Sequence, residues 1–120
     1  GELEKIKRDG VVFVGNARTG QAMPIKWQMY ENYFANLQRL FVPDAVRKLQ
    51  APLYIIHGTK DETVPVECAI EMNTWNKSNR LFLVENGNHN FGGRHPWNSD
   101  TLPEDLEDVL NETVSFFKSA

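Results

Sequence analysis

The chain has 120 residues, of which 41% are hydrophobic and 24% are charged, a composition typical of one soluble globular domain. Its formal net charge of −3 provides no basic face, so we expect neither a nucleic-acid partner nor a membrane partner. No apolar run approaches the ~20 residues of a membrane span, and residues 1–10 lack the pattern of a signal peptide. The compartment stays open: cytoplasmic, or exported if a leader preceded this sequence.

The first fifty residues predict a β-hairpin followed by helices. Two apolar runs, residues 11–14 and 22–25, lie on either side of Gly15, Asn16 and Gly20. Glycine and asparagine between two apolar runs favour a pair of strands joined by a longer loop.

Residues 26–41 repeat apolar side chains at spacings of three and four, which is typical of a helix with one apolar stripe. The stripe consists of Tyr30, Tyr33, Phe34, Leu37 and Phe41. We expect it to pack in a core rather than to line a substrate pocket. A second, short helix is expected to start at Pro43 and Asp44 and to end before Pro52.

The remaining residues alternate strand and helix. Residues 53–58, "LYIIHG", predict a central strand covered on both faces, and residues 80–87 predict a second strand. Between them, residues 65–77 predict a helix with an apolar stripe of Cys68, Met72 and Trp75, which makes Cys68 a packed core thiol rather than a nucleophile. As the single cysteine, Cys68 also excludes an intrachain disulfide.

A last helix is predicted over residues 101–120. Thr101 and Glu104 have the spacing of a capping box. The expected buried stripe consists of Leu106, Val109, Leu110, Thr113 and Phe117. This order of elements predicts an α/β fold in which residues 51–120 form a parallel βαβα unit with a right-handed crossover.

Two polar residues follow the two predicted strands at similar distances. Asp61 comes after the first strand and His89 after the second, so a right-handed crossover brings both loops to the same edge of the sheet. An Asp that accepts a hydrogen bond from one imidazole nitrogen fixes the tautomer while the other nitrogen moves protons. Asp61 and His89 are therefore candidate catalytic residues, although Asp61 alone also suits a turn or a helix cap. His89 alone also suits a loop histidine that satisfies a backbone carbonyl.

The other candidate residues have structural interpretations. His57 ends a strand and is expected to support the loop of Asp61, whereas His95 is interpreted as a surface or lid residue. The spacing of His57 and Asp61 would suit a metal only on a helix, so we predict no metal site. The glycine-rich stretch "NGNHNFGG" does not open a helix, so we predict no cofactor.

The pattern "HGTKDETVP", a helix, "LFLVENGNHNFGG" and a terminal amphipathic helix resembles the C-terminal end of the α/β-hydrolase fold. The resemblance is to the branch of dienelactone-hydrolase-like esterases and prolyl-oligopeptidase-type peptidases, and it covers residues 51–120. It implies that Asp61 is the acid and His89 the histidine of a Ser-Asp-His triad. Residues 1–50 resemble the lid or insertion of such enzymes, which predicts a boundary between residues 50 and 51.

The sequence departs from that family in its serines. Ser78, Ser99, Ser115 and Ser119 are the only ones, and none lies in a G-x-S-x-G motif. The chain is therefore expected to be the C-terminal portion of a serine hydrolase that acts on an ester, thioester or peptide substrate. Its serine would lie upstream, and the isolated chain would be inactive.

A second interpretation is a folded half-domain that does no chemistry and acts by self-association. If the strand that begins at Leu53 lacks its upstream neighbour, its free edge and the apolar stripe of residues 30–41 need a partner. This predicts a homodimer or higher oligomer, with an interface formed by the first fifty residues and the Leu53 strand.

Overall fold

The structure is a computed structural model that describes residues 1–16 and 19–119, and the chain divides into two compact units, Gly1–Val42 and Pro43–Ala120. The two units meet between residues 42 and 43, whereas the sequence predicted a boundary between residues 50 and 51. The short helix that begins at Val42 therefore lies almost entirely in the second unit.

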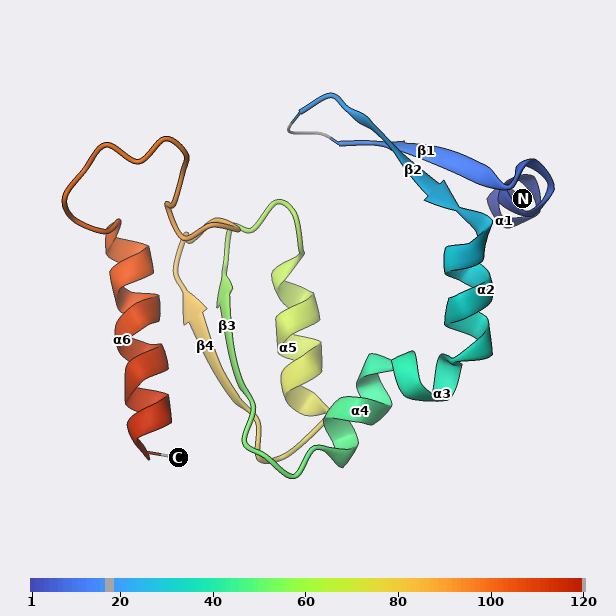
Figure 1. The fold of residues 1–120 in the computed structure, drawn as a ribbon. Coiled ribbons are helices and arrows are strands. Elements are labelled where there is room, and N and C mark those ends of the chain that lie inside the picture. The colour runs from blue at the N-terminus through green and yellow to red at the C-terminus, as the bar shows by residue number, and fades with distance from the viewer. Residues whose placement is uncertain (17–18, 120) are drawn as a thin grey trace. The chain divides into compact units, whose positions relative to one another are not determined.

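The first unit is a β-hairpin with helices before and after it (Figure 1). Its elements are α1 (Glu2–Asp9), β1 (Val11–Gly15), β2 (Ala22–Lys26), α2 (Trp27–Ala35) and α3 (Leu37–Leu40). The strands pair antiparallel, with Val11 opposite Lys26 and Gly15 opposite Ala22, which confirms the predicted hairpin. Its predicted loop includes residues 17 and 18, which lie outside the described residues.

The helix α1 was not predicted, although its ends carry clear signals. Glu2 and Glu4 lie in the first turn and Lys7 in the last, an order that complements the helix dipole. Gly10 follows with φ of 74° and donates its N–H to the carbonyl of Ile6, which closes the helix. The helix contains two apolar side chains, Leu3 and Ile6, spaced by three residues, so its amphipathic pattern rests on a single pair.

The prediction of one long helix over residues 26–41 is wrong, because the chain leaves the helical conformation at Asn36. The Asn36 side chain donates a hydrogen bond of 2.9 Å to the carbonyl of Asn32, so it competes with the backbone for a helical acceptor. The apolar stripe is also not core: Phe34 is 55% exposed and Phe41 is 41% exposed. Among the described residues of this unit, Ile6 is the one buried hydrophobic side chain.

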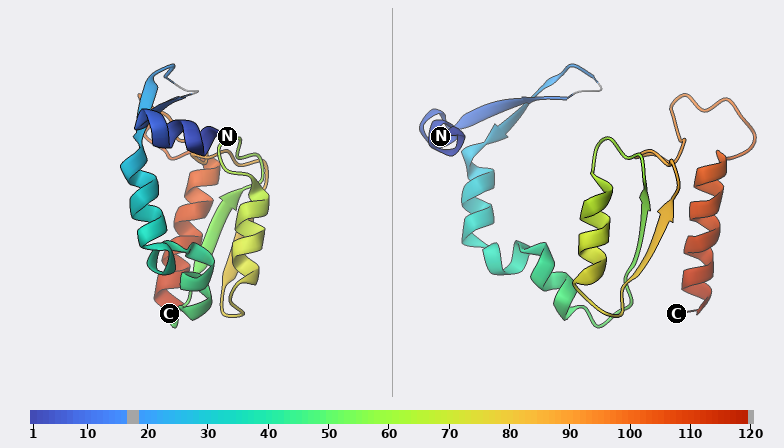
Figure 2. Two further views of the ribbon diagram at one scale, coloured as in Figure 1. Left: turned by 90° about the vertical axis from the view of Figure 1, so that its right-hand side faces the viewer. Right: turned by 180° about the vertical axis from the view of Figure 1, so that it is seen from behind.

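The second unit contains the predicted βαβα arrangement. Its elements are α4 (Val42–Lys48), β3 (Tyr54–Gly58), α5 (Val66–Thr74), β4 (Arg80–Val84) and α6 (Glu104–Ser119), the first of which begins one residue before the unit. β3 and β4 pair in parallel, from Tyr54 opposite Arg80 to Gly58 opposite Val84. The helices α5 and α6 lie on opposite sides of this strand pair (Figures 1 and 2). The carboxyl ends of both strands therefore lie at the same edge.

The buried face of α5 agrees with the predicted stripe at Met72 and Trp75, which are half-buried, but not at Cys68. Ala69 is 4% exposed, and Val66 and Met72 lie half-buried on the same face. Cys68 is exposed, so its assignment as a packed core thiol is wrong. Adjacent residues on a helix point about 100° apart, so burying Ala69 against the strands turns Cys68 away.

The helix α6 agrees with the predicted stripe at Leu106, Val109 and Thr113, which are half-buried, but not at Leu110 and Phe117, which are exposed. It begins at Glu104, so Thr101 lies too far before it to form the predicted capping box. Phe116 packs against the Tyr54 ring with 5.2 Å between ring centroids, and the Tyr54 hydroxyl donates to Glu112. These contacts fix the inward face of α6, and Phe117 is left 72% exposed although it was predicted to be buried. None of the helices in residues 1–16 and 19–119 is long and apolar enough to cross a bilayer.

Candidate active site

The loops that follow β3 and β4 are joined by backbone hydrogen bonds. The N–H of Thr59 donates to the carbonyl of Val84 and that of Lys60 to the carbonyl of Gly87, each at 3.0 Å. The N–H of Asn86 donates to the Thr59 hydroxyl at 2.7 Å. These bonds hold the two loops side by side at the carboxyl ends of the strands.

Glycine at position 58 permits this close approach. A Cβ atom added to Gly58 would lie 2.2 Å from the carbonyl oxygen of Gly87 and 3.0 Å from that of Asn88. Both neighbours are backbone atoms, which cannot move aside as the end of a side chain can. Gly58 therefore sets the distance between the loop of Asp61 and the loop of His89.

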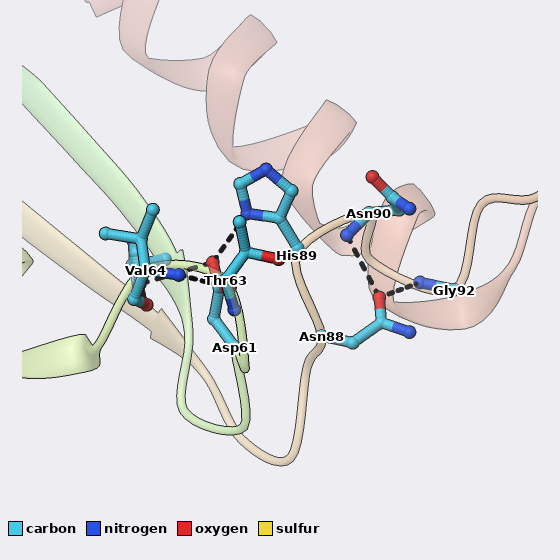
Figure 3. Close-up of polar contacts among 8 residues, drawn as sticks. Asp61, Thr63, Val64, Asn88, His89, Asn90 and Gly92 are labelled. Atoms are coloured by element: carbon cyan, nitrogen blue, oxygen red, sulfur yellow. Dashed lines mark hydrogen bonds and ion pairs between the residues drawn. The ribbon is translucent and has the colours of Figure 1, made fainter. Parts of the chain in front are cut away.

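Asp61 uses both of its carboxylate oxygens. Oδ1 accepts hydrogen bonds from the backbone N–H groups of Thr63 at 2.8 Å and Val64 at 2.9 Å (Figure 3). Oδ2 lies 2.8 Å from Nδ1 of His89, and the Asp61 side chain is 4% exposed. Asp61 thus forms the turn before α5 and also contacts the histidine of the neighbouring loop, so the two interpretations of this residue are compatible.

The hydrogen bonds around Asp61 keep its carboxyl group ionised. Burial would raise the pKa of this carboxyl, but the N–H of Val64, the ring of His89 and the N–H of Thr63 together lower the pKa from 3.8 to about 2. Asp61 is therefore a carboxylate throughout the physiological range of pH.

The carboxylate determines which nitrogen of His89 carries the proton. An ionised carboxylate only accepts hydrogen bonds, so Nδ1 of His89 is the donor and Nε2 of the neutral ring keeps its lone pair. The His89 side chain is 51% exposed. Asn88 closes the turn around it, because its Oδ1 accepts from the N–H groups of Asn90 and Gly92 at 3.0 Å each (Figure 3). The site thus presents a basic nitrogen held by an ionised acid.

The surface beside His89 is a polar hollow of about 370 Å³. It is lined by Lys60, Glu62, Thr63, Asn86, Asn88, His89 and Asn90. A molecule bound there would meet hydrogen-bonding side chains.

The other histidines differ in their surroundings. His57 is 15% exposed, and its Nε2 lies 2.9 Å from the carbonyl oxygen of Val64 and 3.5 Å from Oδ2 of Asp61, so it contacts the acid loop as the sequence analysis expected. His95 is exposed. In residues 1–16 and 19–119, no three His, Cys, Asp or Glu side chains are grouped so that they could hold a metal ion.

The serines of this chain make contacts elsewhere. The hydroxyl of Ser78 bonds to Asn76, that of Ser99 to Thr101 and that of Ser119 to the carbonyl of Phe116. The chain therefore brings together an acid and a histidine, without a serine in a nucleophile motif.

Apart from His57, the sequence did not identify the residues that support the pair. Thr63 and Val64 act through their backbone N–H groups, which carry no signal in residue type. Thr59 and Asn88 act through side chains that are common in turns, and the position of Asn88 next to His89 is a signal that could have been used.

This fold belongs to the α/β class and corresponds to the C-terminal part of an α/β-hydrolase fold, preceded by a hairpin-plus-helix segment. Among the solved structures that match is Est1E from Butyrivibrio proteoclasticus, with a TM-score of 0.59 and 21% sequence identity. The match covers 90% of this chain and 38% of Est1E, so the chain spans well under half the length of that protein. No protein-family model and no curated protein matches the sequence.

Proposed function

We propose that this chain is the acid-and-histidine part of a serine hydrolase that cleaves an ester, thioester or peptide bond. The hydrogen bond of 2.8 Å between Asp61 and His89 is the observation that carries the proposal. It lies at the carboxyl edge of a parallel strand pair, where open α/β folds place their catalytic groups.

Each residue has a defined role in the proposed reaction. His89 Nε2 removes the proton from a serine hydroxyl as that oxygen attacks the carbonyl carbon, and it then protonates the leaving group. Asp61 holds the ring in the tautomer that leaves Nε2 basic, and its negative charge stabilises the imidazolium that forms. The low pKa of Asp61, about 2, keeps that charge in place during the cycle.

The serine of the proposed triad lies outside this sequence. The fold corresponds to 38% of Est1E, and the chain contains no G-x-S-x-G motif. The serine and the oxyanion hole would come from a preceding segment of a longer protein.

A direct test uses the chain itself. Because the nucleophile and the oxyanion hole are absent, the isolated chain should neither hydrolyse a p-nitrophenyl ester above the background of free imidazole nor react with a fluorophosphonate probe. Stoichiometric labelling of a serine in this chain would contradict the proposal. A G-x-S-x-G motif in the reading frame upstream of Gly1 would support it, and its absence there would favour a non-enzymatic module.

Self-association is a second candidate function. In the part of the chain that the structure describes, β3 is paired with β4 along one edge only, and Phe34 and Phe117 are more than half exposed. Free strand edges and exposed aromatic side chains favour association. We propose a homodimer or higher oligomer through the first fifty residues and β3. Light scattering coupled to size exclusion tests it, and a monodisperse monomer at micromolar concentration would contradict it.

A further inference from the structure

We infer that His57 is a positioning residue for the Asp61–His89 pair. Its ring is hydrogen-bonded to the Val64 carbonyl and lies near the same carboxylate oxygen that His89 contacts. The role of His57 in catalysis rests on the proposed function, but its contacts with Val64 and Asp61 are independent of that proposal.

The hydrogen bond of His57 fixes its tautomer. Nε2 of His57 lies 2.9 Å from the carbonyl oxygen of Val64, and a carbonyl oxygen only accepts hydrogen bonds. Nε2 is therefore the protonated nitrogen, and Nδ1 of the neutral ring carries no proton. The side chain is 15% exposed, so few water molecules compete for this bond.

This bond acts on Asp61 through one residue, Val64. The carbonyl of Val64 accepts from His57, and the N–H of Val64 donates to Oδ1 of Asp61 at 2.9 Å. The two groups lie in adjacent peptide planes that meet at the Val64 Cα, so a bond to each restrains the backbone of Val64 on both sides. His57 thereby restrains the segment whose N–H groups orient the Asp61 carboxylate.

The ring also acts on Asp61 directly. Oδ1 already accepts two backbone N–H groups, while Oδ2 lies 2.8 Å from Nδ1 of His89 and 3.5 Å from Nε2 of His57. The separation of 3.5 Å exceeds a good hydrogen bond, but the N–H dipole of His57 still favours negative charge at this oxygen. The ring also occupies space in which water would otherwise compete with His89 for Oδ2. We therefore expect the tautomer of His89 to depend on His57.

The experiment observes the histidine rings of the 120-residue chain by long-range ¹H–¹⁵N spectroscopy at alkaline pH. In the wild-type chain, His57 should show the Nε2–H tautomer and His89 the Nδ1–H tautomer. A wild-type His57 in the Nδ1–H form would overturn the inference, and this observation needs no variant to fold.

A matched pair of variants separates the hydrogen bond from packing. Gln and Met have similar lengths, but Gln can donate to the Val64 carbonyl and Met cannot. We expect His89 to keep the Nδ1–H tautomer in His57→Gln and to lose it in His57→Met. The control His95→Gln, a change at an exposed histidine, should leave the tautomers of His57 and His89 unchanged. An unchanged His89 spectrum in His57→Met, or an equal loss in His57→Gln, would overturn the inference. These spectra involve no turnover, so a failure of the proposed function would leave their interpretation intact.

Discussion

Replacing Gly58 by alanine should separate the two loops of the candidate site. The new Cβ would lie 2.2 Å from the carbonyl oxygen of Gly87, and ordinary contacts begin near 3.4 Å, so one backbone must move by roughly 1 Å. The movement would stretch the 3.0 Å hydrogen bond from the N–H of Lys60 to the same carbonyl.

The expected loss of stability has two parts. Overpacking of this kind costs about 1–3 kcal/mol, and loss of one backbone hydrogen bond adds about 1 kcal/mol. We therefore expect Gly58→Ala to lower the free energy of unfolding by about 2–4 kcal/mol and Tm by on the order of 10 °C.

Urea and thermal denaturation of the 120-residue chain measure this effect. Gly15→Ala is the matched control, because a Cβ at Gly15 meets no atom within 4 Å. The reasoning would be refuted if Gly58→Ala and Gly15→Ala unfolded within about 0.5 kcal/mol of each other.

Two further predictions concern side chains that anchor the second unit. Tyr54→Phe removes the hydroxyl that donates to Glu112, so it should lower the free energy of unfolding by about 1 kcal/mol. Tyr33→Phe, a change at an exposed position, is the control and should have little effect. Equal effects of the two variants in denaturant titrations would contradict this prediction. Asp61 has a lower pKa in the folded chain, about 2, than its ordinary value of 3.8, so its ionised form stabilises the fold. That stability is complete above about pH 4 and is lost as the pH falls towards about 2. Urea midpoints measured across this range should show the gap between the wild type and Asp61→Asn closing at low pH, and a gap that stays constant would contradict the assignment.

The parts of the fold that the sequence predicted depend on local signals. The apolar runs of β3 and β4, bounded by glycine and polar residues, are visible without knowledge of the tertiary structure. The meeting of Asp61 and His89 follows from one further rule, since parallel pairing places the carboxyl ends of both strands at one edge.

The features of the fold that the sequence did not predict depend on side-chain contacts rather than on the apolar pattern. The apolar residues of α6 span a broad face, and the contacts of Tyr54 with Glu112 and Phe116 show which part of the helix is turned inward. In α5, Ala69 is buried and its neighbour Cys68 is exposed. At Asn36, a side-chain hydrogen bond overrides the periodicity of the apolar stripe. Periodicity alone contains none of this information.

The most direct measurement of the central claim is the turnover number for a p-nitrophenyl ester of the protein encoded by the complete reading frame. We predict that His89→Ala and Asp61→Asn each lower kcat by about 10⁴-fold while the protein stays folded, since the first removes the base and the second favours the wrong imidazole tautomer. Wild-type turnover in either variant would contradict the assignment of that residue to the catalytic pair.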